Sequence, residues 1–194
     1  MSDPDAVSRH FNASRELLER VAGDRVLLAA IGGIADRIAQ TLRAGSKLLI
    51  AGNGGSAADA QHVAAEFLSR FGFDRNPLPA IALTTDTSVL TAIGNDYGFE
   101  RVFERQVRGL GRKGDAFIAI STSGRSPNVL AALAAAREIG MTTIGFCGSD
   151  GKMLALCDLI LAVPSEETAL IQQMHITALH AICGIVEREL FAKG

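Results

Sequence analysis

Short apolar runs alternate along the chain with longer segments in which apolar residues recur at helical spacing. Five of the runs are apolar at consecutive positions, which is typical of strands buried on both faces of a parallel sheet. These runs are Lys47 to Ala51, Ala80 to Thr84, Asp115 to Ser121, Met141 to Cys147 and Asp158 to Val163. The alternation of such runs with helical segments predicts an α/β fold around a five-stranded parallel sheet.

The segments between and around these runs carry apolar residues at helical spacing. They predict helices over residues 26–44, 56–71, 87–93, 127–139 and 152–156, and long terminal helices over roughly 6–22 and 166–192. A chain of 194 residues with 48% hydrophobic content has the size of one compact domain. We therefore expect a single domain over 1–194, with an N-terminal helical segment (1–24) and a C-terminal helix (166–192). Right-handed crossovers would place ligands at the carboxyl ends of the strands.

Composition and charge narrow the classes of partner. Nineteen Lys and Arg residues against 21 Asp and Glu give a net charge of −2 without long like-charge runs, so the chain shows no electrostatic footprint for nucleic acid. Residues 1–16 lack the apolar core of a secretory signal, and no stretch of about 18 uninterrupted apolar residues indicates a membrane span. Cys147, Cys157 and Cys183 form no C-x-x-C pair, which favours reduced core cysteines in the cytosol.

A glycine-rich loop, Gly52-Asn53-Gly54-Gly55-Ser56, follows the first apolar run. Ser56 is placed to cap the next helix, with Asp59 three residues on, and a helix N-terminus suits an anion or a polar sugar. A tight turn without any ligand is the alternative. A dinucleotide site is a second alternative, because Gly52-x-Gly54-x-x-Ala57 meets the permissive fingerprint. That site also requires an acidic residue about 20 positions later, at the end of the second strand, and here the second strand ends well beyond that distance.

A hydroxyl-rich loop, Ser121 to Ser126, follows the third apolar run, and Pro127 occupies the expected first position of a helix. Its four hydroxyls and the backbone N–H groups of a helix N-terminus predict a phosphate site. The loop is not a Walker A motif, because no Gly-Lys-Ser/Thr sequence follows it. A hydroxyl-rich cap on a surface turn is the alternative.

The helix expected after the glycine-rich loop carries His62, Glu66 and Arg70 at positions i, i+4 and i+8, which share one face. Val63 and Phe67 fall on another side, where they can pack against the sheet. A His and a Glu one turn apart can bind one divalent metal or act as a proton-transfer pair beside a sugar. A solvated face with ion pairs is the alternative.

The expected C-terminal helix places Gln172, Gln173, His175 and His180 in an otherwise apolar segment. Polar groups on so apolar a helix need hydrogen-bond partners. We expect His175 to be a structural histidine in the core or at an interface. Because the helix is apolar on more than one side, a partner helix or another subunit should cover the side that the sheet leaves open.

Taken together, these motifs and Gly94-Asn95-Asp96 resemble the pattern of the SIS-domain phosphoheptose isomerases, over roughly residues 17–191. The resemblance implies a flavodoxin-like three-layer sandwich and a cytoplasmic homotetramer with active sites at subunit interfaces. Its implied reaction converts sedoheptulose 7-phosphate into D-glycero-D-manno-heptose 7-phosphate, the first step of lipopolysaccharide and ADP-heptose biosynthesis. Small-molecule sugar phosphates are then the expected partners, and nucleic acid and membrane are not.

The resemblance also implies residue roles. Glu66 would be the general base and His180 the general acid. The residues implied in phosphate binding are Ser121, Thr122, Ser123 and Ser126. The residues implied in lining the sugar site are Asn53, Gly54, Gly55, Ser56, Arg70, Asp96 and Gln172. The residues implied in holding one zinc ion per subunit are His62, Glu66, Gln172 and His180.

These residue types suit aldose–ketose isomerisation, which needs a base at carbon and an acid at oxygen. Zinc would polarise the carbonyl and stabilise the enediolate. Gln172 and His180 are eight positions apart, about 12 Å along a straight helix. Both can reach one ion only if the helix start is irregular or two chains contribute, which favours an interfacial site.

Two alternatives share this pattern. A non-catalytic SIS module, either a sugar-phosphate-binding regulator or a replication-initiator-associating protein, would use the same sheet and loops. Such relatives tend to lack the carboxylate and the histidine that are present here as Glu66 and His180. An isomerase for another sugar phosphate, such as glucosamine or arabinose phosphate, is the second alternative, and the single short domain favours the heptose enzyme over it.

Overall fold

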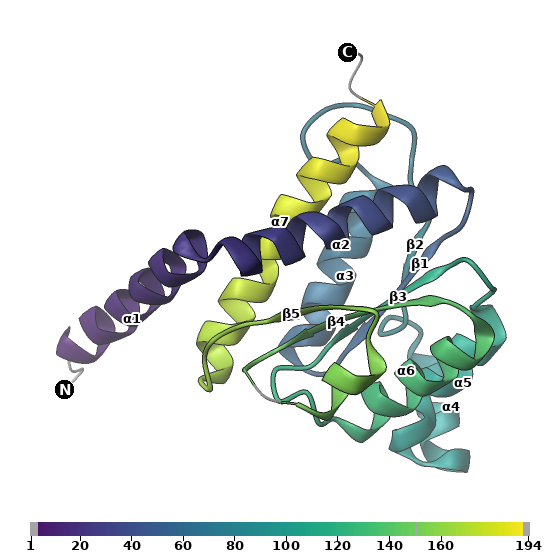
Figure 1. The fold of residues 1–194 in the computed structure, drawn as a ribbon. Helices are drawn as coiled ribbons and strands as arrows, with labels where there is room; N and C mark the ends of the chain where they lie inside the picture. The colour runs from purple at the N-terminus through teal and green to yellow at the C-terminus, as the bar shows by residue number, and fades with distance from the viewer. Residues whose placement is uncertain (1–3, 150, 192–194) are drawn as a thin grey trace.

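The computed structural model describes residues 4–149 and 151–191, in which strands and helices alternate (Figure 1). The strands are β1 (Leu48–Gly52), β2 (Ala80–Ala82), β3 (Ala116–Ile120), β4 (Thr142–Cys147) and β5 (Leu159–Ala162). The α-helices are α1 (Pro4–Gly23), α2 (Arg25–Arg43), α3 (Gly55–Leu68), α4 (Thr87–Tyr97), α5 (Val102–Leu110), α6 (Pro127–Ile139) and α7 (Thr168–Phe191). The 3-10 helices are η1 (Phe99–Arg101) and η2 (Lys152–Leu156). Residues 1–3 and 192–194, which belong to the expected domain and its terminal segments, lie outside the described residues.

The five strands form one sheet in the order β2-β1-β3-β4-β5, and every neighbouring pair is parallel. This confirms the predicted five-stranded parallel sheet. Alternate residues of β1 enter different cores: Leu48 and Ile50 belong to one buried cluster, and Leu49 and Ala51 to another. Because both faces are covered, each strand has to be apolar at consecutive positions.

Helices lie on both sides of the sheet and complete the predicted three-layer α/β sandwich (Figure 1). Helices α2, α3 and α7 pack in the cluster that contains Leu48 and Ile50. Helices α5 and α6 pack in the cluster on the opposite face. The loops at the carboxyl ends of β1 and β3 therefore lead into helices on opposite faces, α3 and α6, and the ends of these two neighbouring strands meet at one edge of the sheet.

The start of α3 differs from the prediction. Gly54, with φ of 56°, is the cap residue and makes no side-chain capping hydrogen bond, so Ser56 lies inside the first turn, where it is buried. The chain turns at Gly54, where the absence of a side chain permits this positive φ, and this moves the helix start ahead of Ser56. The expected capping role of Ser56 and Asp59 is therefore wrong.

The end of α3 also differs, because the helix stops at Leu68 and not at residue 71. The guanidinium of Arg75 donates to the carbonyl oxygens of Glu66 and Phe67, at 2.8 and 2.7 Å, and so satisfies the last turn of the helix. Arg70 consequently lies in the loop after α3. The predicted helical stripe of His62, Glu66 and Arg70 is wrong for its third member.

The segment that forms η1 and α5 was not predicted to be helical. Two of its polar residues are buried: Glu104 accepts hydrogen bonds from the exposed Arg101 and Arg108, and Gln106 donates to the carbonyl oxygens of Leu83 and Val102. Val102, Phe103 and Val107 are also buried, so α5 does carry an apolar face, which the prediction from sequence overlooked.

Helix α7 is packed against α2, α3 and α1, so other helices of the same chain cover much of it. Its length and a mean hydropathy of 1.4 over 18 residues are compatible with a membrane span, but 56% of that stretch is buried inside the protein. Burial of this kind is typical of a core helix. The three cysteines, all within the described residues, form no disulfide; Cys147 and Cys183 are buried, as expected of core residues, and Cys157 is half-buried.

Candidate active site

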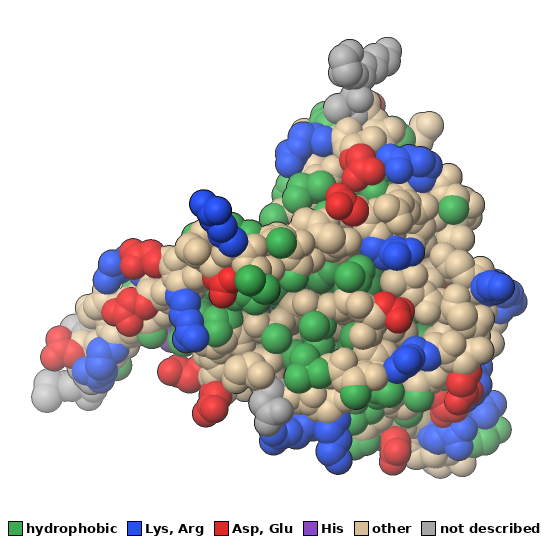
Figure 2. Space-filling view, in the orientation of Figure 1, with side chains coloured by type: hydrophobic (Ala, Val, Ile, Leu, Met, Phe, Trp, Pro, Cys, Tyr) green, Lys and Arg blue, Asp and Glu red, His purple; other side chains and the backbone are tan. Residues whose placement is uncertain are grey.

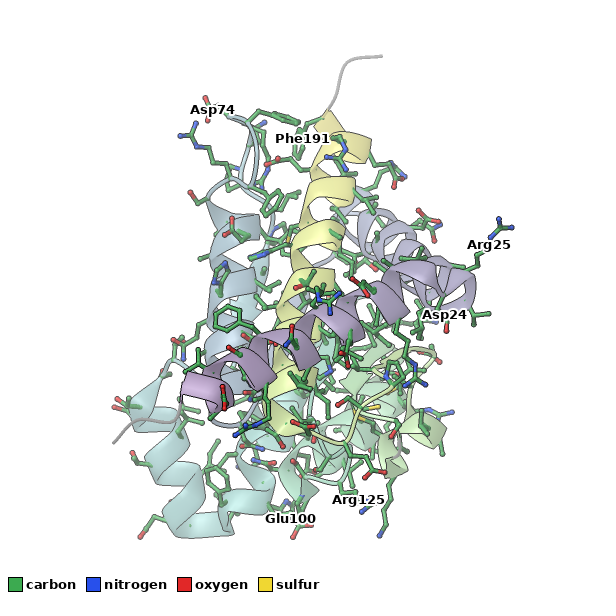
Figure 3. The ribbon with its side chains drawn as sticks, turned by 90° about the vertical axis from the view of Figure 1, so that its left-hand side faces the viewer. Asp24, Arg25, Asp74, Glu100, Arg125 and Phe191 are labelled. Atoms are coloured by element: carbon green, nitrogen blue, oxygen red, sulfur yellow. The ribbon has the colours of Figure 1, made fainter. Side chains whose placement is uncertain are left out.

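Helices α3 and α7 run side by side in the same direction and bring together polar residues from distant parts of the chain (Figure 3). The contacts follow in order along both helices: Gly55 lies against Gln172, His62 against His180, and Phe71 against Glu187. The candidate site lies around the second of these contacts, between His62 and His180. It extends to the two polar loops that follow β1 and β3.

Three ligand-type side chains converge around the contact between His62 and His180. His62 Nε2 lies 3.0 Å from His180 Nε2 and 3.1 Å from Glu66 Oε1. The ligand atoms of all three residues lie within 4.8 Å of one another. The helical spacing predicted that His62 and Glu66 would meet, and this is confirmed. The contact with His180 joins residues 118 positions apart.

The three residues fit a divalent metal of the zinc type. Two imidazoles and one carboxylate, with room for a further ligand, are the donor set of many catalytic zinc sites. Ligand atoms on a tetrahedral ion with bonds of about 2.1 Å lie roughly 3.4 Å apart, close to the separations above. The side chain of His62 is 47% exposed and that of Glu66 24%, so the cluster is accessible to a small molecule from solvent.

Asp59 is a further acidic residue of this cluster that sequence reasoning did not place there. Its Oδ2 is buried and has no hydrogen-bond partner among the described residues. Burial raises the pKa of Asp59, against the opposing effect of His62 and His180 nearby. A carboxylate beside two imidazoles can fix a ring tautomer. The i, i+3 spacing of Asp59 and His62 was the signal that the sequence offered.

The glycine-rich loop is in direct contact with α7. A Cβ on Gly55 would lie 2.5 Å from Gln172 Nε2, so a larger residue here would displace that amide from its present position. Gln172 therefore lies at the beginning of α3, about two helical turns before the level of His62 and His180. The structure brings His62, Glu66 and His180 together, and it places Gln172 beside the loop that contains Asn53 and Ser56.

The hydroxyl-rich loop has the local geometry that the sequence predicted. Pro127 opens α6, and the hydroxyls of Ser121 and Ser126 lie 3.0 Å apart. The Ser123 hydroxyl accepts a hydrogen bond from the backbone N–H of Arg125 at 3.2 Å. A cavity of about 340 Å³ adjoins the loop. Its lining residues are Thr122, Ser123, Arg125, Gly148, Ser149, Ser165, Glu166 and Ile171. Hydroxyls, a guanidinium and a helix N-terminus are groups that bind phosphate.

The two loops are connected by a reciprocal amide pair. Asn53 Nδ2 donates to Asn128 Oδ1, and Asn128 Nδ2 donates to Asn53 Oδ1, both at 2.9 Å. Asn128 is buried in the first turn of α6. Sequence reasoning did not single it out, since its partner is 75 positions away. This pair fixes the glycine-rich loop relative to the hydroxyl-rich loop.

Of two further expected site residues, only Asp96 lies on the other face of the sheet from the cluster. Arg70 is exposed in the loop after α3. Asp96 is exposed on α4, whose half-buried Leu90 and Ile93 pack against the core on the other face of the sheet from α3 and α7. Its Oδ1 accepts a hydrogen bond from Asn95 Nδ2 at 2.8 Å. The single chain does not bring Asp96 to His62, Glu66 and His180.

His175 has the structural position that its apolar surroundings predicted. Its side chain is buried, and Nε2 donates to the carbonyl oxygen of Cys147 at 3.2 Å. The ring of Phe146 packs edge-on against it, with 5.8 Å between ring centroids. Burial lowers the pKa of His175 to about 4, in spite of the hydrogen bond to Cys147.

Comparisons with known proteins identify the family of the chain. A family model described as the SIS domain matches residues 9–148. The phosphoheptose isomerase of Bradyrhizobium sp. (strain BTAi1) is 56% identical over 187 residues, 96% of this chain and 94% of the relative. A solved phosphoheptose isomerase from Neisseria gonorrhoeae has a TM-score of 0.88 and 46% identity, with 94% of this chain and 97% of that one covered. One from Francisella tularensis has a TM-score of 0.93 and 37% identity, with 97% and 100% covered. The chain therefore belongs to the phosphoheptose isomerase family of SIS-domain proteins.

Proposed function

We propose that this chain is an aldose–ketose isomerase that converts sedoheptulose 7-phosphate into D-glycero-D-manno-heptose 7-phosphate, the opening step of lipopolysaccharide and ADP-heptose biosynthesis. One observation carries the proposal: Glu66 and His180 converge from two helices, near the glycine-rich loop and the hydroxyl-rich loop. The relatives named phosphoheptose isomerase, similar over nearly the whole chain, support the same reaction.

In the proposed mechanism Glu66 is the base that removes the proton from C1 of the ketose. The electron pair forms the C1–C2 double bond of an ene-diol, and His180 donates a proton to the oxygen on C2. Glu66 then gives the proton to C2 while His180 takes back a proton from the hydroxyl on C1, which yields the aldehyde and restores both residues. Because Glu66 and His180 lie on neighbouring helices, they can act from the same side of the substrate, Glu66 on the carbon and His180 on the oxygen.

The hydroxyl-rich loop would hold the 7-phosphate through Ser121, Thr122, Ser123 and Ser126. Its position at the N-terminus of α6 adds backbone N–H groups and a favourable helix dipole. The sugar hydroxyls would be bound by the loop of Asn53, Gly54, Gly55 and Ser56, together with Gln172 and Arg70. The amide pair of Asn53 and Asn128 would keep the two ends of the substrate at a fixed separation.

We also propose one zinc ion per subunit, held by His62, Glu66 and His180, with Gln172 as the fourth protein ligand if the substrate complex brings it closer. The donor set and separations of the first three residues support this. When bound, the ion would supply Lewis-acid polarisation of the substrate carbonyl.

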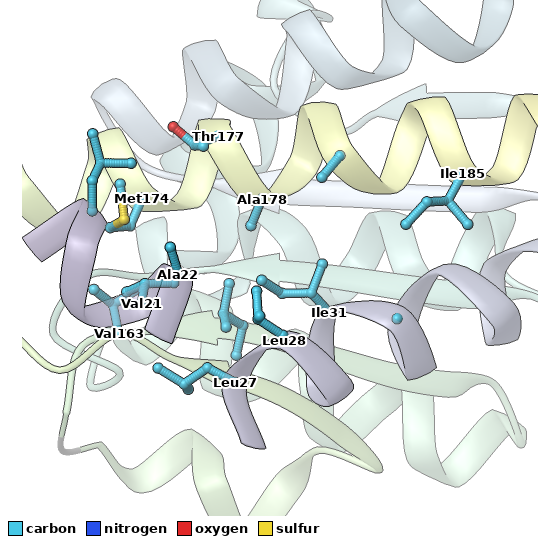
Figure 4. A pocket seen from close by; sticks show the side chains of 14 residues that line it. Val21, Ala22, Leu27, Leu28, Ile31, Val163, Met174, Thr177, Ala178 and Ile185 are labelled. Carbon is cyan, nitrogen blue, oxygen red and sulfur yellow. The ribbon is translucent and has the colours of Figure 1, made fainter. Parts of the chain in front are cut away.

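We infer that the working enzyme is a cytoplasmic homotetramer. Helix α1 projects away from the body of the chain (Figure 1), and hydrophobic side chains lie along one face where α1 meets α2 (Figure 2). Val7, Phe11 and Leu18 of α1 and Val26 and Leu28 of α2 are exposed. An apolar pocket of about 320 Å³ opens between α1, α2 and α7 (Figure 4). If Asp96 lines a sugar site, it has to do so from a second subunit. Three cysteines without a disulfide fit a reducing compartment.

One assay tests the proposal. Purified protein is incubated with sedoheptulose 7-phosphate, and in parallel with arabinose and fructose phosphates, with and without a chelator. We expect turnover of the heptulose phosphate above the others, loss of activity with chelator, and recovery with Zn²⁺. Glu66→Gln and His180→Ala should each lower kcat by about 10² to 10⁴. Binding of sugar phosphates without turnover would instead identify a non-catalytic SIS module, and near-native activity of either variant would remove its residue from the mechanism.

A further inference from the structure

A buried ion pair lies next to the site of Glu66 and His180, where the loop that follows α3 meets the end of α7. Arg75 Nε donates to Glu187 Oε1 at 3.1 Å, and both side chains are only 2% exposed. The loop next to Asp74 and the end of α7 at Phe191 lie close together in Figure 3. The guanidinium of Arg75 also lies over the ring of Phe191, 5.7 Å from its centroid.

Arg75 binds the end of the helix that carries the proposed base. Its Nη2 donates to the carbonyl oxygen of Glu66 at 2.8 Å, and its Nη1 donates to that of Phe67 at 2.7 Å. These carbonyls belong to the last turn of α3, where no helical N–H is available to them. The cation also interacts favourably with the negative end of the helix dipole. The backbone of the proposed base is thus bonded directly to Arg75.

Glu187 binds the loop that covers the proposed acid. Its carboxylate accepts hydrogen bonds from the backbone N–H groups of Phe71 and Gly72, at 2.9 and 2.6 Å. Burial alone would raise the pKa of Glu187, but these two bonds and Arg75 lower it overall, so the carboxylate is ionised at neutral pH. Phe71 then packs on His180, with 5.7 Å between the ring centroids.

One face of α7 carries these contacts. His180, Gly184 and Glu187 follow at i, i+4 and i+7, so they lie on the same side of the helix. A Cβ on Gly184 would lie 3.2 Å from the ring of Phe71, so glycine permits the close approach. The ion pair therefore links α3 just after Glu66 to α7 two turns after His180.

We propose that Arg75 and Glu187 are positioning residues for the isomerisation, which fix the separation and orientation of Glu66 and His180 across the two helices. A buried ion pair of this kind contributes little net stability compared with an apolar pair, and its better-attested use is to specify geometry. Neither residue touches the site of reaction, so both act through the groups that they hold. The inference rests on the proposed roles of Glu66 and His180.

The test compares two isosteric substitutions, Glu187→Gln and Asp115→Asn. Asp115 is a matched control because its buried carboxylate also accepts bonds from two backbone N–H groups, those of Lys47 and Arg112, and from one cationic side chain, that of Lys47. It precedes β3, at the end of the sheet opposite to the loops of the site. Steady-state kcat and KM, the inhibition constant of inorganic phosphate and the unfolding midpoint are measured for both variants.

We expect both substitutions to lower the unfolding midpoint, and only Glu187→Gln to lower kcat, by about 10- to 100-fold, as for a catalytic group displaced by about 1 Å. KM and phosphate inhibition should stay within about threefold, because the phosphate loop is not contacted. Glu187→Asp keeps the charge on a shorter side chain and should give an intermediate loss of kcat. This variant replaces Glu187→Gln in the test if the glutamine variant does not fold.

The possible outcomes distinguish failure of the positioning role from failure of the proposed reaction. An active wild type with unchanged kcat in Glu187→Gln, or an equal loss of kcat in Asp115→Asn, overturns the positioning role and leaves the proposed reaction intact. A wild type that binds phosphate but turns over no sugar phosphate overturns the proposed reaction, and with it the role of the pair.

Discussion

Two histidines of α7 lie only five positions apart, yet their surroundings suit them to different tasks. His175 is fully enclosed, donates through Nε2 to a backbone carbonyl, and leaves Nδ1 without a partner among the described residues. His180 is half-buried and faces His62 and the ring of Phe71. A proton taken up by His175 would be buried without a counter-charge, which disfavours the charged form. Carboxylates do lie near His180, those of Glu66 and Asp59.

This difference predicts a pH dependence of stability that belongs to His175. Its folded pKa of about 4 is lower than the unfolded value of about 6.5, so the unfolded chain binds the extra proton between those values. Stability should therefore fall as the pH is lowered, by about 2 kcal/mol between pH 7 and pH 5 from this residue alone.

Unfolding in urea at both pH values, for the wild type and for His175→Gln, measures this contribution. Glutamine can still donate to the carbonyl of Cys147 but does not titrate, so the variant should lose correspondingly less stability on acidification. Equal losses in both proteins would show that His175 is not the residue responsible.

At the residue scale, sequence reasoning found side chains whose neighbours are local and missed those whose partners are distant. His62 and Glu66 are one helical turn apart, so their contact could be read from spacing. Asn128 meets Asn53 across 75 positions, and Arg75 meets Glu187 across 112. No periodicity records such contacts, because they depend on which strands lie next to each other. His180 was placed only through the resemblance.

At the scale of elements, the strands and most helices could be predicted because continuous burial requires continuous apolar runs. The exceptions are elements held by polar groups. Helix α5 buries Glu104 and Gln106 through hydrogen bonds, and α3 ends where Arg75 takes up its carbonyls. Apolar patterns carry no information on the contacts of Arg75, so α3 was extended too far; α5 was missed although Val102, Phe103 and Val107 give it an apolar face.

The loop between β3 and α6 supports a prediction about what it recognises. Ser121 and Ser126 already bond to each other, and Ser123 is exposed beside the cavity. Ser123→Ala combined with Ser126→Ala removes two hydroxyls that a phosphate would accept from. We expect binding of sedoheptulose 7-phosphate to weaken by about 1 to 3 kcal/mol, or roughly 5- to 150-fold.

Titration calorimetry with the phosphorylated sugar and with sedoheptulose itself distinguishes the phosphate from the sugar. Only the phosphorylated ligand should be affected. Ser149→Ala, which lines the same cavity from the loop after β4, is the comparison for a general change of the cavity. Equal weakening of both ligands by the double variant would mean that the loop does not read the phosphate.

For the whole molecule, one chain encloses its own core but leaves an apolar face where α1 meets α2. Ile182 is central to the apolar pattern of α7, yet it is buried within the chain among residues of α2 and the sheet. The chain itself thus covers more of α7 than its composition predicts. Among the exposed apolar side chains, Leu18 of α1 and Leu28 of α2 line the pocket of Figure 4 together with Ala181 and Ile185 of α7. Any subunit contact that covers this face also shields α7 close to His180.

Assembly and activity should therefore be lost together when this face is charged. Leu28 is 46% exposed at the pocket, and Leu154 on η2 is 43% exposed elsewhere, which makes Leu28→Glu and Leu154→Glu a matched pair. Leu28→Glu should dissociate the tetramer, because a carboxylate cannot be buried in an apolar interface without a partner. Light scattering and turnover, measured across one dilution series, should show activity following the assembled fraction in Leu28→Glu and unchanged behaviour in Leu154→Glu. A wild-type monomer that is fully active would contradict the tetramer and the contribution of Asp96 from a second subunit.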